Sequence, residues 1–181
     1  GIRGLMHAKA TSFPAQIAVA STWNRSLVRE IGRTTGREAR ALGVTITHIL
    51  ETHLHADFIS GHMDLARQTG ATIYAPKSAR CAFDHVAVAE GDTIGIEDMS
   101  LEVWETPGHT PEHVSYVVTD RSRGDAPVGV FVGDVLFVGD VGRPDLFPGI
   151  ATELAGKLYH SLHDKLLTLP DNLPEFYISD T

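Results

Sequence analysis

Residue types that bind transition metals recur at alternate positions in one short stretch of the chain. Residues 52–62 read THLHADFISGH and place His53, His55 and Asp57 close together. Imidazole nitrogens and carboxylate oxygens are ligands of iron, zinc and manganese, and a thiolate site is not available to a chain with a single cysteine. An ordinary polar loop is the alternative, but further candidate ligands in similar settings downstream favour a metal site.

Two more segments carry residues of the same kind just after an apolar run. The segment 106–113 reads TPGHTPEH and contributes His109 and His113, and Asp134 follows a glycine at the end of another run. Because a strand end is rigid, the loops after several strands can hold their side chains at one point. The sequence therefore predicts a single site built from three loops. We expect His62 and His113 to pack or to orient ligands rather than to bind the metal.

The apolar and β-branched runs before these loops predict the strands that position them. Residues 44–50 lead into the first loop, 100–106 alternate with a period of two before the second, and 128–132 precede Asp134. Further strands are expected at 71–75 and 114–119, and helices at 25–42, 61–69 and 153–169. This order, with no repeat and no linker, predicts one α/β domain with mixed sheets over residues 1–181.

Length and composition are those of a soluble globular protein. Of the 181 residues 43% are hydrophobic and 21% charged, and the formal net charge is −8. The acidic balance argues against binding to nucleic acid or to an anionic membrane, and no apolar run approaches the roughly 18 residues of a membrane span. The one cysteine, Cys81, excludes an internal disulfide and favours a reducing compartment, so we expect a cytoplasmic protein in which Cys81 is a small, half-buried residue.

The sequences of these loops resemble the motifs of the metallo-β-lactamase superfamily, which has a His-x-His-x-Asp segment, a Pro-Gly-His-Thr turn and a Gly-Asp step. That resemblance implies a four-layer αββα sandwich with the metal at the edge between its two sheets. The segments ETHLHADFISGH, TPGHTPEH, VGD and FVGDVGRPDL are similar to the persulfide dioxygenases of this superfamily, which are sometimes joined to rhodanese domains. The similarity covers residues 44–170. Residues 1–43 match weakly and the C-terminal end is short, so a fragment of a longer chain is expected.

By position, the resemblance implies one Fe(II) per chain, bound by His53, His109 and Asp134. Two histidines and one carboxylate leave coordination positions open for a sulfur atom and for O2. His55 and Asp57 would orient the ligands and waters around the metal. Zinc and manganese are alternatives to iron, because geometry and supply choose among these metals as much as ligand type does.

Two further residues bear on the substrate and on the reaction. Arg143, in the segment GRPD, is suited to bind a carboxylate of a glutathione-type thiol, and the alternative is a solvated arginine paired with Asp145. Hydrolases of the superfamily usually have a second-metal histidine where this chain has Phe58. Since phenylalanine cannot bind a metal, and a two-metal mechanism needs both ions to activate water, Phe58 favours a one-metal enzyme.

The resemblance thus implies an Fe(II)-dependent dioxygenase that oxidises glutathione persulfide, or a similar small persulfide, with O2 to sulfite and thiol. One alternative is a metal-dependent thioester hydrolase of the glyoxalase II type. Another is a metal-free binding domain, against which the complete ligand set argues. A homodimer and a rhodanese domain, fused or separate, are further partners that the resemblance allows.

Overall fold

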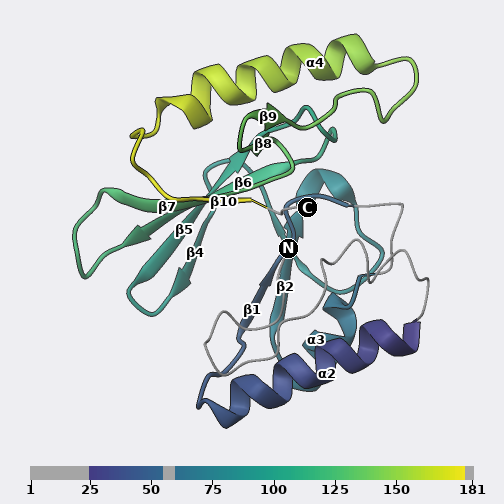
Figure 1. Ribbon diagram of the computed structural model, residues 1–181, viewed down its shortest axis with the longest axis vertical. Helices are drawn as coiled ribbons and strands as arrows, with labels where there is room; N and C mark the ends of the chain where they lie inside the picture. The colour runs from purple at the N-terminus through teal and green to yellow at the C-terminus, as the bar shows by residue number, and fades with distance from the viewer. Residues whose placement is uncertain (1–24, 55–59, 178–181) are drawn as a thin grey trace.

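Two stacked β-sheets with helices on their outer faces form the protein, and the computed structural model describes residues 25–54 and 60–177 (Figure 1). The first sheet has the order β1-β2-β3 and is parallel: His48–Leu50, Thr72–Pro76 and Val86–Val88. The second has the order β10-β7-β6-β5-β4, from Glu175–Tyr177, Pro127–Gly133, Val114–Asp120, Met99–Glu105 and Thr93–Ile96. In this second sheet β10 runs parallel to β7 and the other pairs are antiparallel, so it is mixed.

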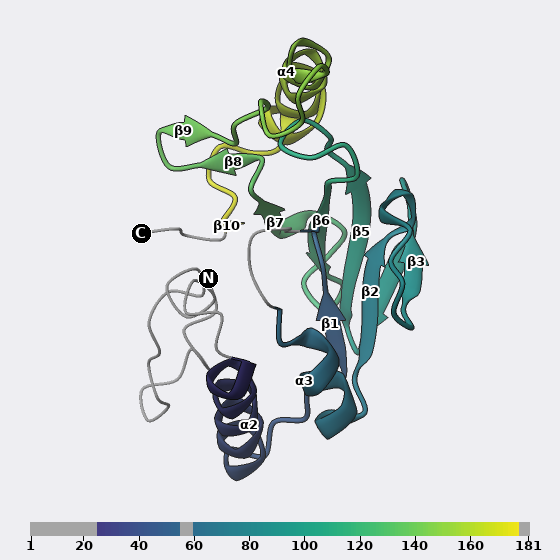
Figure 2. The ribbon, with the colours of Figure 1, turned by 90° about the vertical axis from the view of Figure 1, so that its right-hand side faces the viewer.

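The helices complete the four layers. Helices α2 (Arg25–Ala41) and α3 (His62–Thr69) pack together outside the first sheet, and α4 (Ala151–His160) lies across the far side of the second (Figure 1). A small hairpin, β8 (Leu136–Phe137) with β9 (Asp140–Val141), projects below α4 (Figure 2). These layers confirm the predicted αββα sandwich. Within the described residues, no helix has both the length and the apolar character needed to cross a membrane.

The second sheet is buried on both faces, which makes it the rigid base of the molecule. Successive side chains of a strand point to opposite faces. On β6, Tyr116 and Val118 therefore join the core between the two sheets, whereas Val117 joins the core under α4. In that second core Val117 packs with Leu158 of α4 and with Leu162, which lies just after the end of α4. Loops that leave the ends of β5 and β7 are consequently anchored from both sides.

The strand predicted at 44–50 is shorter in the structure, because its first residues end a helix instead. Gly43 has a φ of +73°, and the Val44 N–H donates to the carbonyl of Ala39 at 2.8 Å. This bond is the one that closes a Schellman cap at a helix C-terminus. Pairing with β2 then begins only at His48. Strands β3, β4 and β10 were not predicted.

The helix predicted at 153–169 is helical in the structure but changes its hydrogen bonding part-way. Helix α4 continues into a π-helical segment η2 (Ser161–Lys165) and a 3-10 turn η3 (Leu166–Thr168). At this change the Ser161 hydroxyl donates to the carbonyl of Pro107 at 2.7 Å. Close packing accompanies that bond, since a Cβ on Gly108 would lie 2.5 Å from Cβ of Leu158. The helix therefore supports the turn that carries His109.

Candidate metal centre

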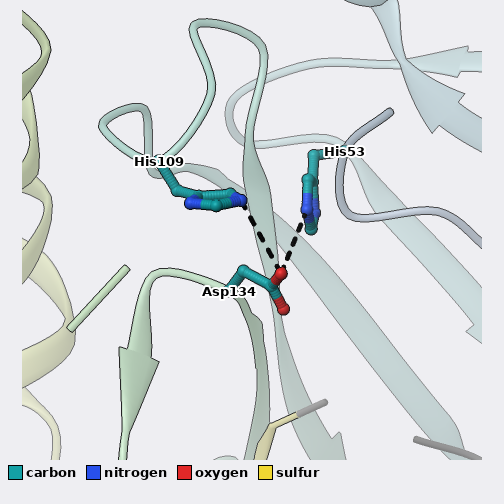
Figure 3. Close-up of side chains that lie close together, drawn as sticks. All are labelled: His53, His109 and Asp134. Atoms are coloured by element: carbon teal, nitrogen blue, oxygen red, sulfur yellow. Dashed lines mark ion pairs between the residues drawn. The ribbon is translucent and has the colours of Figure 1, made fainter. Parts of the chain in front are cut away.

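The three predicted ligands come together at the edge between the sheets. His53 follows β1, His109 follows β5, and Asp134 follows β7 directly. All three are buried, and one ligand atom from each lies within 4.8 Å of the other two. Oδ2 of Asp134 is 3.5 Å from Nε2 of His53 and 3.7 Å from Nε2 of His109 (Figure 3). Among the residues that the structure describes, this is the one group of three or more such side chains close enough to share an ion.

The chemistry of this donor set fits a divalent transition metal. Both N···O separations exceed the usual limit of a hydrogen bond, about 3.2 Å. The side chains therefore point to one place without a direct hydrogen bond between these atoms. A buried carboxylate is costly unless a cation or hydrogen-bond donors stabilise it. Two imidazoles with one carboxylate suit Fe(II), zinc or manganese. His53, His109 and Asp134 can therefore hold the ion that the sequence predicts.

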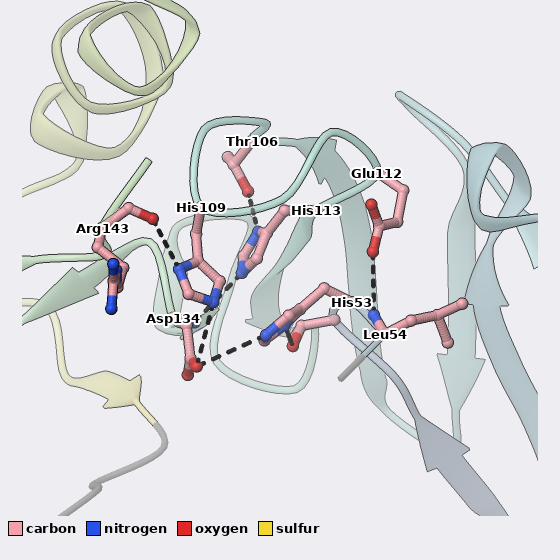
Figure 4. A network of polar contacts seen from close by, with 9 residues as sticks. His53, Leu54, Thr106, His109, Glu112, His113, Asp134 and Arg143 are labelled. Atoms are coloured by element: carbon pink, nitrogen blue, oxygen red, sulfur yellow. Dashed lines mark hydrogen bonds and ion pairs between the residues drawn. The ribbon is translucent and has the colours of Figure 1, made fainter. Parts of the chain in front are cut away.

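The second ring nitrogen of each histidine is held by a partner that orients the ring. Nδ1 of His109 donates to the main-chain carbonyl of Arg143 at 3.2 Å (Figure 4). Since a carbonyl can only accept, the proton is on Nδ1, and Nε2 keeps its lone pair. Nδ1 of His53 lies 2.9 Å from the hydroxyl of Thr52, which can accept a hydrogen bond from the ring in the same way.

The loop that carries His109 is also tied to its neighbours. The N–H of Leu54 donates to Oε1 of Glu112 at 3.1 Å, which links this loop to the one that carries His53 (Figure 4). His113 is fully buried but does not belong to the ligand group; its Nε2 accepts the N–H of Asp134 at 3.2 Å. This position agrees with the expectation that His113 orients ligands.

Two glycines allow the main chain to pack closely around the ligands. A Cβ on Gly142, which follows the β8–β9 hairpin, would collide with the carbonyl oxygen of Asp134 and lie 3.0 Å from Cβ of His109. Gly133 has a φ of +56°, and a Cβ there would lie 2.7 Å from Oγ1 of Thr52. We assigned no role to either glycine from the sequence. Their places beside a predicted ligand, in VGD and GDVGRPD, are the signal that could have revealed them.

The guanidinium of Arg143 points away from the ligands and pairs with Asp145. Its Nε and Nη2 donate to the two carboxylate oxygens at 2.7 and 2.9 Å, and both side chains are exposed. The hydrogen bond from Arg143 lowers the pKa of Asp145. The structure thus has the pairing that was the alternative for Arg143, while the carbonyl of the same residue reaches His109.

Glu51 and His62, which flank the His53 loop in the sequence, form a second polar group. Burial raises the pKa of Glu51 to about 7 and lowers that of His62. Oε1 of Glu51 is 3.3 Å from Nδ1 of His62, and the imidazole packs on the ring of Phe83 with centroids 4.5 Å apart. Both shifts have the same cause, because burial disfavours the charged form of each group. His62 thus packs as expected, and the role of Glu51 was not foreseen.

Three residues of the sequence-based interpretation lie outside the described residues. They are His55 and Asp57, predicted to orient ligands, and Phe58, which distinguishes the one-metal from the two-metal enzymes. Their predicted roles stay predictions.

Comparison with known proteins decides the family. A family model described as the metallo-beta-lactamase superfamily matches residues 21–179. The chain belongs to the metallo-β-lactamase superfamily. A solved superfamily structure, that of ETHE1 from Myxococcus xanthus, superposes with a TM-score of 0.68 and 32% sequence identity, over 80% of this chain and 59% of that one.

Relatives of two activities match this superfamily member. The mitochondrial persulfide dioxygenase ETHE1 of Mus musculus is 29% identical over 174 residues, which cover 94% of this chain and 65% of that protein. A hydroxyacylglutathione hydrolase of Bradyrhizobium sp. (strain ORS 278) is 37% identical over 138 residues, or 75% of this chain and 49% of that protein. The chain therefore spans about half to two thirds of the length of these curated relatives.

Proposed function

We propose that this protein is an Fe(II)-dependent persulfide dioxygenase that acts on glutathione persulfide or a similar small persulfide. The observation that supports it most is the buried group of His53, His109 and Asp134. Two imidazoles and one carboxylate on one side of an ion leave other coordination positions open, as non-haem Fe(II) oxygenases require. We propose one iron per chain, with zinc and manganese as the alternative metals.

The proposed reaction is RSSH + O2 + H2O → RSH + HSO3⁻ + H⁺. The S–S bond breaks, the outer sulfur loses four electrons to O2 in net terms, and the inner sulfur leaves as the thiol. An Fe(II) ion held by His53, His109 and Asp134 would supply the redox chemistry. The chain supplies position and charge.

Each residue of the centre has a defined task in this proposal. The Arg143 carbonyl keeps a proton on Nδ1 of His109, and the Thr52 hydroxyl can accept a hydrogen bond from Nδ1 of His53, which leaves both Nε2 atoms available as ligands. Burial of the three ligands limits access of water. The exposed guanidinium of Arg143 pairs with Asp145 and can exchange that partner for a substrate carboxylate. His55 and Asp57 are proposed to orient ligands and waters.

A thioester hydrolase is the second candidate, and the match to hydroxyacylglutathione hydrolases favours it. Hydrolysis by a pair of metals needs a second set of ligands. Phe58 stands where such a second set would have a histidine, and phenylalanine cannot bind a metal. The match to the mouse dioxygenase also extends over more of the chain, 94% against 75%. Both points support the dioxygenase.

Partners and location complete the proposal. The substrates are a small persulfide and O2; a homodimer and a rhodanese domain that supplies persulfide sulfur are proposed partners. A cytoplasmic location stays a prediction from the single cysteine.

Oxygen uptake after anaerobic loading with Fe(II) tests the proposed function. On addition of glutathione persulfide, the wild-type protein should consume one O2 per sulfite formed. His53→Ala should show neither, whereas His48→Ala, which changes a histidine at the start of β1, should keep both. If iron-loaded protein consumes no O2 but a zinc-loaded sample cleaves a hydroxyacylglutathione thioester, the hydrolase replaces the dioxygenase.

A further inference from the structure

His113 lies where two of the three ligands meet. The residue is fully buried, in the turn between β5 and β6. Its Nε2 accepts the main-chain N–H of Asp134 at 3.2 Å, and its ring packs against the ring of His53 with centroids 4.8 Å apart and planes tilted by 30° (Figure 4). One side chain that binds no metal in our assignment therefore contacts two that do.

The direction of these hydrogen bonds follows from the donors. A main-chain N–H can only donate, so Nε2 of His113 must be the acceptor and the ring proton must be on Nδ1. Nδ1 lies 2.9 Å from Oγ1 of Thr106, which accepts that proton. Thr106 in turn lies 2.8 Å from the hydroxyl of Ser115, and all three side chains are buried. The Asp134 N–H thus fixes the tautomer of His113, and Thr106 stabilises it by accepting the hydrogen bond from Nδ1.

The backbone around Asp134 is shaped for this contact. Gly133 has a φ of +56°, a region that side chains other than glycine rarely adopt. A Cβ there would lie 2.6 Å from Nε2 of His113. The glycine therefore lets the main chain approach the imidazole closely enough for the Asp134 N–H to bond to it. Without that bond, the peptide that carries the carboxylate loses one of its fixed points.

We propose that His113 is a positioning residue that fixes the peptide of Asp134, through the relay Ser115–Thr106–His113, and thereby sets the affinity of the metal centre. Partners of this kind, which touch ligands and not the ion, contribute about 10- to 100-fold to metal affinity in other proteins. The inference rests on the proposed metal centre but not on the proposed reaction, so metal binding alone can test it.

Two amide substitutions distinguish the contribution of Nε2 of His113 from that of Nδ1. In His113→Gln the side-chain oxygen reaches the place of Nε2 and can still accept the Asp134 N–H. In His113→Asn the shorter amide takes the place of Nδ1, which keeps the contact with Thr106 but leaves the Asp134 N–H without its acceptor. His48→Asn is the matched control, because Nδ1 of His48 also lies close to a threonine hydroxyl, that of Thr47, at 2.8 Å.

The measurement is titration of the metal-free proteins with Co(II), followed by its visible absorption, with circular dichroism to compare folding. We expect His113→Asn to bind Co(II) at least 10-fold more weakly, and His113→Gln and His48→Asn to stay within about 3-fold of wild type. The absorption bands of His113→Asn should also shift, because the carboxylate is no longer held in one orientation. If His113→Asn binds as tightly as wild type, or if Asn and Gln weaken binding equally, the inference is wrong. Failure of the wild type to bind Co(II) would overturn the metal centre itself.

A second pair of variants decides the matter if His113→Asn does not fold. Thr106→Val removes the acceptor of the hydrogen bond from Nδ1, so the tautomer whose Nε2 accepts the Asp134 N–H loses a stabilising partner. We expect weaker Co(II) binding in Thr106→Val and recovery in Thr106→Ser, which restores the hydroxyl. Equal affinity in Thr106→Val and wild type would contradict the relay.

Discussion

The main-chain carbonyl of Arg143 accepts a hydrogen bond from Nδ1 of His109 at 3.2 Å, while the guanidinium of the same residue turns outward to Asp145. Arg143 therefore has two separable parts. Its backbone holds a metal ligand in the correct tautomer, and every substitution except those that move the backbone retains that contact. Its side chain is free of the metal ligands and can be altered to examine the substrate alone.

Arg143→Ala should weaken substrate binding without loss of metal. If the guanidinium binds a carboxylate of the substrate, its removal should raise KM for glutathione persulfide roughly 10-fold and leave kcat and iron content little changed. The KM for a persulfide without a carboxylate should not move, which provides the control. Arg143→Lys should recover part of the affinity, because the charge remains but the planar fork is lost. Equal KM values for Arg143→Ala and wild type would remove Arg143 from the substrate site.

His109→Ala should abolish retention of the metal. Two donors, His53 and Asp134, would remain of the three that converge, and the Asp134 carboxylate would lose a neighbour 3.7 Å away. Elemental analysis after desalting of protein loaded with Fe(II) should find close to one iron per chain in the wild type and little in the variant. His160→Ala is the control, because His160 is an exposed residue at the end of α4. Full iron and full activity in His109→Ala would mean that the ligand assignment is wrong.

Gly142→Ala should destabilise the protein and weaken metal binding together. The added Cβ would overlap the carbonyl oxygen of Asp134 and crowd His109, so the two ligands must move apart. Overpacking of this kind costs about 1–3 kcal/mol, which for a chain of this size lowers Tm by roughly 2–12 °C. Thermal melts and Co(II) titration would measure the two effects.

Gly156→Ala is the control for this substitution. Gly156 lies within α4, and a Cβ there would meet nothing within 4 Å. Because alanine is the better helix former, the control should raise stability by about 0.5–1 kcal/mol. A Gly142→Ala protein as stable as wild type, with unchanged Co(II) affinity, would show that the β8–β9 hairpin moves without effect on the centre.

His62 should make the protein less stable as the medium becomes acidic. Burial lowers the pKa of His62 in the folded state, so below about 6.5 the unfolded chain takes up a proton that the native state resists. That contribution to stability is present at higher pH and is lost as the pH falls from 6.5 towards the native pKa. The neighbouring Glu51, whose pKa is raised to about 7, acts in the opposite direction and favours the folded state at low pH.

Comparison with His62→Asn isolates the contribution of the imidazole. Asparagine does not titrate, and its amide can still reach the Ser60 hydroxyl, which lies 2.6 Å from Nδ1 of His62. The Tm of the metal-free wild type should therefore fall more steeply than that of the variant between pH 7.5 and 5.5. Parallel curves for the two proteins would show that His62 is not protected from protonation in the folded state.

Local patterns in the sequence predicted which loops carry candidate ligands, and the resemblance to the superfamily implied which three of those residues bind the metal. His53, His109 and Asp134 each follow an apolar run, and runs of alternating or β-branched residues identify strands reliably enough to place loops at their ends. The strand predicted at 44–50 begins later in the structure, and the reason is also local. Val44 is β-branched, but the positive φ of Gly43 directs its N–H to the carbonyl of Ala39, and the helix cap prevails over strand propensity.

Residue type and the period of apolar residues are enough to predict which side chains can bind a metal and that they lie at strand ends. How those side chains are held depends on contacts between segments far apart in the chain. The carbonyl of Arg143 reaches His109 across 34 positions of sequence, and Nε2 of His113 meets the Asp134 N–H across 21. Contacts of this kind depend on the register of β5, β6 and β7 and on the absence of a Cβ at Gly133 and Gly142, which no local pattern encodes.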